Sequence, residues 1–92
     1  MNTTVREIDI PTDPRERAIW VLGQLKLRGE SFSALSKSHG KSRNWARQAM
    51  FQASAEAERA IATAIDLTPR DLFPERYDAS GRRLHQVRWA AA

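Results

Sequence analysis

SFSALSKSHGKSRNWARQAM, residues 31–50, is the stretch that decides the fold. Two short helical segments in it are separated by Gly40, which can adopt the left-handed backbone of a tight turn without a steric penalty. Phe32 and Leu35 give the first segment an apolar inner side, and Ala46 is small enough for the second segment to cross it closely. Two short helices joined by a glycine-containing turn are typical of a helix-turn-helix.

The second segment is predicted to be a helix over residues 42–50 with an apolar side and a polar side. Arginine can form two hydrogen bonds with guanine, and asparagine or glutamine can do the same with adenine. The predicted base-reading residues are Ser42, Arg43, Asn44, Arg47 and Gln48. Hydroxyl and ammonium groups nearby suit contacts with phosphates. The predicted phosphate-binding residues are Ser31, Ser33, Ser36, Lys37 and Lys41.

Positive charge is concentrated around this stretch. The chain has a net charge of +4, and residues 15–47 carry eight Lys and Arg but only two acids. Residues 1–14 and residues 48–78 are both net acidic, whereas residues 79–92 contain arginines and no acid. Basic charge segregated in this way indicates a polyanionic partner, nucleic acid before any other.

The rest of the pattern predicts an all-α fold, a compact domain of four to five helices. Asp13 and Pro14 are typical of a helix start, as are Thr68 and Pro69 further along the chain. An alanine-rich helix is predicted from about residue 54 to residue 65. The predicted organisation is a flexible N-terminal arm over residues 1–12, a helix-turn-helix domain over residues 13–78 and a basic C-terminal tail over residues 79–92.

The tail leaves three readings open. It could add phosphate contacts beside the binding site, as basic arms do in other helical readers of DNA. It could instead link neighbouring copies through Leu84 and Trp89, or it could have no role in binding. The candidate tail contacts with DNA are Arg82, Arg83 and Arg88.

Other function classes find little support in the residues. The chain has no cysteine and two histidines far apart in sequence, so neither a metal site nor any other cofactor site is predicted. No serine has a histidine base nearby, no glycine-rich loop could hold a phosphate, and no small-molecule ligand is predicted, so an enzyme is not expected. No apolar run approaches the roughly 20 residues of a membrane span. We expect a cytoplasmic, nucleoid-associated protein.

Two segments resemble the Ner-like DNA-binding proteins of transposable phages and their bacterial relatives. RAIWVLGQLKLRGESFSALSKSHG, residues 17–40, looks like the opening of that family, and AIATAIDLTPRDLFPERY, residues 60–77, resembles its fourth helix and the segment that follows. The resemblance implies a fold akin to phage repressor heads, operator binding and a recognition helix at Ser42–Met50. The chain departs from the family at Trp45, where a smaller aliphatic residue is usual.

The predicted function is sequence-specific binding to a double-stranded DNA operator, and through it control of transcription, with the helix at residues 42–50 in the major groove. A homodimer or paired copies on DNA are expected, because one short helix reads too few base pairs for useful specificity. The alternative is a helical protein-interaction module that docks on another transcription factor or on polymerase. The salt dependence of binding distinguishes the two hypotheses, because DNA binding weakens steeply as the salt concentration rises.

Overall fold

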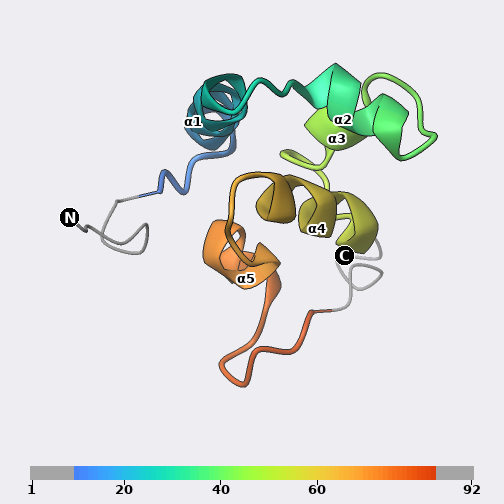
Figure 1. The fold of residues 1–92 in the computed structure, drawn as a ribbon. Coiled ribbons are helices and arrows are strands. Elements are labelled where there is room, and N and C mark those ends of the chain that lie inside the picture. The colour runs from blue at the N-terminus through green and yellow to red at the C-terminus, as the bar shows by residue number, and fades with distance from the viewer. Residues whose placement is uncertain (1–9, 85–92) are drawn as a thin grey trace.

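The computed structural model describes residues 10–84, and all regular structure in this range is helical apart from one isolated β-bridge (Figure 1). The elements in chain order are α1 (Pro14–Leu27), α2 (Phe32–Ser38), α3 (Trp45–Gln48), α4 (Ala55–Ala64), α5 (Pro69–Leu72) and the 3-10 turn η2 (Pro74–Arg76). The prediction of an all-α fold with a helix-turn-helix is confirmed. Residues 1–9 of the predicted arm and Arg88 in the predicted tail lie outside the described residues.

The helices α1, α2 and α5 begin where a side chain accepts a hydrogen bond from a free backbone N–H group. The Asp13 carboxylate accepts a hydrogen bond from the Glu16 N–H, and Pro14 occupies the first position of α1. Ser31 caps α2 by accepting from the Ala34 N–H. Thr68 and Asp71 form a reciprocal capping box at α5, because each side chain accepts from the backbone N–H of the other.

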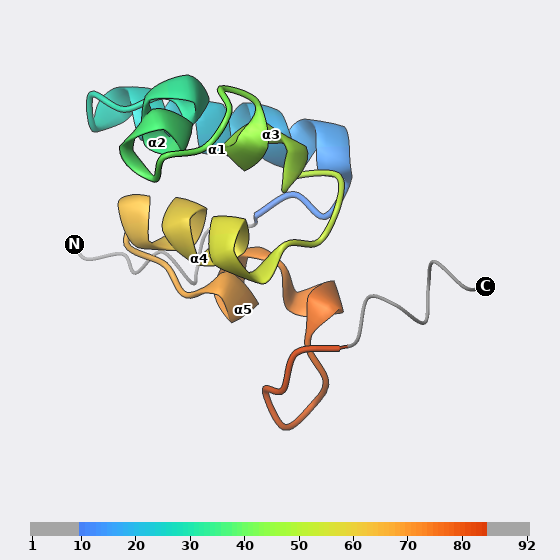
Figure 2. The same cartoon turned by 90° about the vertical axis from the view of Figure 1, so that its right-hand side faces the viewer.

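The core lies between two groups of helices. Figure 2 shows α1, α2 and α3 on one side and α4 and α5 on the other. The buried apolar residues come from all five helices and the segments between them, and include Val21, Leu25, Leu35, Met50, Ile61 and Phe73. The alanines Ala46, Ala49 and Ala57 are also buried. Small residues at these positions let the helices approach closely, so the core is built from close helix packing rather than from many large side chains.

A buried carboxylate joins three parts of the chain. Glu58 on α4 is fully buried and accepts hydrogen bonds from Arg76 and Arg83, both at 2.9 Å. Arg76 also donates to the Ala49 carbonyl at 2.8 Å, just beyond the end of α3. A buried charge is tolerated only when it is paired and hydrogen-bonded. These bonds therefore tie the C-terminal end of α3 and the last described residues to α4.

A second ion pair joins α1 to the segment that follows α5. The Arg17 guanidinium is almost fully buried and donates to the Leu72 carbonyl and the Glu75 carboxylate. Burial alone would raise the pKa of the Glu75 carboxyl, but the hydrogen bonds from Arg17 and from a backbone N–H, with the charges of Arg17 and Arg76, outweigh it and hold that pKa below its ordinary value. The pair therefore stabilises the fold at neutral pH and loses this contribution as the pH falls through the pKa of the folded state.

The start of the predicted tail is folded onto the domain. Tyr77 and Arg83 form an antiparallel β-bridge, and the Leu84 N–H donates to the Arg76 carbonyl at 2.8 Å. Arg83, predicted as a candidate tail contact with DNA, pairs its guanidinium with the buried Glu58. Arg82 is exposed on the same turn. The predicted domain boundary at residue 78 thus falls inside a folded segment.

Candidate nucleic-acid interface

The turn between α2 and α3 is held by backbone hydrogen bonds around Gly40. This glycine has a φ of 70°, the left-handed conformation that its position requires. Its N–H donates to the Lys37 carbonyl, and the Lys41 N–H donates to the Ser36 carbonyl. The carbonyls of Ser36 and Lys37 near the end of α2 are thereby satisfied, and the chain reverses into α3 over a few residues.

Ser36 holds the two helices together. Its hydroxyl donates to the Phe32 carbonyl at 2.8 Å and accepts from the Ala46 N–H at 2.9 Å. The side chain is fully buried. The prediction that Ser36 binds phosphate is therefore wrong, and the residue instead fixes the position of α3 against α2.

The recognition helix is shorter than the predicted span of residues 42–50. Regular α-helix covers only Trp45–Gln48, and Asn44 is the residue that precedes it, with ψ near 0°. Serine and asparagine compete with helix formation by favouring turns, which explains the later start. Beyond Gln48 the backbone continues in tighter bonds, such as Met50 N–H to the Arg47 carbonyl.

The predicted base-reading residues nevertheless lie together on the surface. Asn44, Arg47 and Gln48 are exposed, on the side of α3 opposite the buried Ala46 and Ala49. Ser42 and Arg43 are exposed in the turn just before it. Within the described part of the chain, none of the five predicted side chains makes a hydrogen bond or salt bridge. Their donors and acceptors are therefore available to a ligand. We call residues 42–48 the recognition segment.

The predicted phosphate contacts differ in their surroundings. Ser33 and Lys37 on α2 are exposed, and Ser31 uses its hydroxyl oxygen to cap that helix. Lys41 lies 3.7 Å from the Glu56 carboxylate and 5.6 Å from the centre of the Trp45 ring. Its charge is already partly neutralised within the protein, unlike that of Lys37.

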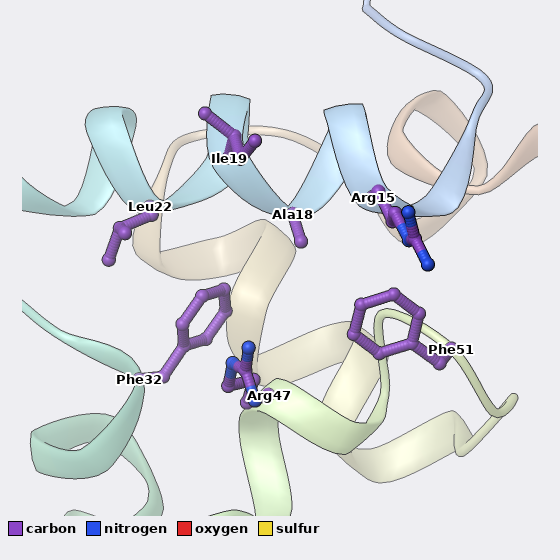
Figure 3. A pocket seen from close by; sticks show the side chains of 7 residues that line it. All are labelled: Arg15, Ala18, Ile19, Leu22, Phe32, Arg47 and Phe51. Carbon is purple, nitrogen blue, oxygen red and sulfur yellow. The ribbon is translucent and has the colours of Figure 1, made fainter.

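A groove beside the recognition segment was not predicted from the sequence. It has a volume of about 550 Å³ and lies between α1 and α3 (Figure 3). The lining residues of this α1–α3 groove are Arg15, Ala18, Ile19, Leu22, Phe32, Arg47 and Phe51. The sequence could have indicated that Phe51 is exposed, because this residue follows Arg47 by four positions and so lies on the same side of the helical path. Arg15 and Ile19 had no such signal.

Residues 10–84 lack two kinds of structural feature. No cluster of three or more His, Cys, Asp or Glu side chains is suited to hold a metal ion in this range. Nor is any helix there long and apolar enough to cross a membrane.

Comparisons with known proteins agree with this geometry. Residues 20–89 match the model of a family described as winged helix-turn-helix DNA-binding. The "Negative regulator of transcription" of Escherichia phage D108 is 32% identical over 57 residues, which cover 62% of this chain and 78% of the phage protein. The similarity to phage regulators seen in the sequence is confirmed. Because the family match spans most of the chain, including α2, the turn at Gly40 and α3, the protein belongs to the winged helix-turn-helix DNA-binding family.

Proposed function

We propose that this DNA-binding protein represses transcription by placing its recognition segment in the major groove of an operator. One observation carries the proposal. Residues 42–48 present Arg43, Asn44, Arg47 and Gln48 to solvent without partners among the described residues, on a helix anchored by Ser36. Exposed donors and acceptors of this kind match base edges in the major groove. The sign of regulation follows the phage D108 protein, whose name makes it a negative regulator.

Base reading by arginine is testable by single replacements. We expect either Arg43→Ala or Arg47→Ala to weaken operator binding by about 1–3 kcal/mol and to relax the preference at one base pair. The operator would first be isolated by selecting bound fragments from genomic DNA. Fluorescence anisotropy with single-base variants of that operator then measures both affinity and preference.

Arg59→Ala is the matched control, because it removes the same charge from an exposed position on α4. Its specific affinity should stay close to that of the wild-type protein. If both Arg43→Ala and Arg47→Ala kept full affinity and unchanged base preference, the recognition segment would not read DNA.

Phosphate binding makes a different prediction for the lysines. Lys37→Ala should weaken binding to operator and to scrambled DNA alike and should reduce the slope of affinity against salt by about one counterion. Lys41→Ala should weaken binding less, because the Glu56 carboxylate already offsets the charge of Lys41 and the Trp45 ring already contacts it. Anisotropy titrations over a range of salt concentrations test this order, and an equal or larger effect of Lys41→Ala contradicts it.

We further propose that two copies bind one operator. The regular part of α3 spans only Trp45–Gln48, so one copy contacts few base pairs. Two half-sites supply the specificity that one lacks. The rival proposal, a protein-interaction module, predicts no retention of duplex DNA and little dependence of partner binding on salt.

A further inference from the structure

The α1–α3 groove exposes apolar side chains beside the recognition segment. Its apolar side chains include three that remain open to solvent, with exposed fractions of 71% for Ile19, 37% for Leu22 and 48% for Phe51. An apolar concave surface with polar rims is typical of a protein-binding site rather than of a phosphate-binding one.

The charges of the groove restrict what can occupy it. Arg15 on α1 and Arg47 on α3 lie on its rims (Figure 3), and neither forms a salt bridge with another described residue. Two copies meeting groove to groove would bring four guanidinium groups together, which like-charge repulsion opposes. The groove therefore suits a peptide that combines aliphatic side chains with carboxylates.

The chain itself contains such a peptide. Residues 5–9 read VREID, in which Glu7 and Asp9 flank Ile8, and Val5 lies close by. Its two carboxylates outnumber its one arginine, Arg6. The order carboxylate, isoleucine, carboxylate complements an apolar floor that has Arg15 at its rim.

The length of chain before α1 argues against binding of this peptide in the groove of its own chain. In Figure 3 the segment before α1 runs past the N-terminal end of that helix and leads away from the groove, and Ile10 packs against the core. A helix with its side chains is roughly 10–12 Å across, so the path around it is roughly 17 Å. Covering that path takes about five extended residues. Residues 5–9 would all be needed to span the path around α1 to their own groove. Their carboxylates would then lie along that path and not in the groove.

We propose that residues 5–9 of one copy bind in the α1–α3 groove of a second copy. The proposal rests on the proposed pairing of two copies on an operator, for which it supplies the contact. Each copy donates one peptide and receives one, so the exchange closes as a two-fold dimer. Arg15 is the counter-charge that we assign to the carboxylates, because it lies outside the recognition segment.

Disulfide trapping tests the contact directly, because the chain has no cysteine of its own. A chain with Ile8→Cys is mixed with a chain carrying Ile19→Cys, and the mixture is oxidised mildly. We expect a cross-linked heterodimer, since a disulfide forms only when the two Cα atoms come within roughly 7 Å. Leu27→Cys is the matched control, because it lies on the same helix, is 79% exposed and is outside the groove.

Three outcomes overturn the proposal. Equal cross-linking of Ile8→Cys to Leu27→Cys would show that contact is not confined to the groove. No cross-linking to Ile19→Cys would show that the peptide binds elsewhere. In a chain carrying both Ile8→Cys and Ile19→Cys, disulfide-bonded monomers in place of dimers would show that the peptide occupies its own groove.

Charge exchange gives a second, independent readout. Arg15→Glu should weaken pairing by at least about tenfold in sedimentation equilibrium, since it sets like charges against each other. Adding Glu7→Lys and Asp9→Lys to the same chain should restore pairing, and failure to restore it contradicts the proposal.

Binding of the wild-type protein to a single half-site distinguishes the failure of the peptide exchange from the failure of the proposed operator binding. If that binding persists while trapping fails, only the peptide exchange is wrong. If trapping succeeds while no duplex is bound, only the proposed operator binding is wrong.

Discussion

Glu58→Ala is expected to lower the free energy of unfolding by about 3–5 kcal/mol, because it removes the closest carboxylate from the buried Arg76 charge. Arg76 is only 6% exposed, and its guanidinium pairs with Glu58 at 2.9 Å. A small domain has roughly 5–15 kcal/mol of stability in total, so the loss would bring it close to unfolding. Urea denaturation followed by circular dichroism measures the change.

The same replacement should also reduce DNA affinity. Arg76 donates to the carbonyls of Ala49 and Met50, which end the path of α3, so its release loosens the recognition segment. Glu56→Ala is the matched control on the same helix, because its ion pair with Lys41 is exposed. That change should cost only about 0–1 kcal/mol. Similar losses of stability from the two variants would contradict the role assigned to Glu58.

Leu35→Ala is expected to lower the free energy of unfolding by about 2–5 kcal/mol, through lost burial and the cavity left behind. Leu35 lies on the inner side of α2, is 6% exposed and belongs to the core that joins the two groups of helices. Thermal denaturation of the variant should show a lower and broader transition. DNA binding should fall with the folded fraction, because α2 positions α3 through Ser36.

Leu27→Ala provides the comparison for this prediction. It deletes the same atoms from a side chain that is 79% exposed at the end of α1, so its cost should stay within about 0.5 kcal/mol. An unchanged melting temperature for Leu35→Ala would place α2 outside the core and would remove the packing on which the recognition segment depends.

Two serines of α2 show the limit of prediction from local sequence. Ser33 and Ser36 lie on one short helix and are equally polar, and the sequence marks both as phosphate contacts. Only the approach of α3 decides that Ser36 is buried against Ala46 while Ser33 faces solvent. A hydroxyl can serve either purpose, so its role depends on what packs against it. The length of α3 was mispredicted for a related reason, since helix patterning alone did not weigh the turn preference of Ser42 and Asn44.

The arginines show the same limit over longer distances. Arg76 and Arg83 are 18 and 25 residues from Glu58, and no local pattern pairs them. A run of arginines without acids nearby looks like a free basic tail, and part of it is used to neutralise a buried carboxylate. The α1–α3 groove also could not be predicted from the sequence, because it exists only where exposed residues of α1 face Phe32 and Phe51.

Local chemistry therefore determined the parts of this protein that depend on neighbours in the chain. Asp13, Ser31 and Thr68 mark helix starts, Gly40 marks the turn, and the spacing of small and apolar residues places the helix-turn-helix, because each acts within about one helical turn. The tertiary structure alone decided which polar groups are buried, which cations stay free for DNA and where an apolar groove remains open. Those outcomes depend on desolvation and contact between segments distant in sequence, which no local pattern encodes.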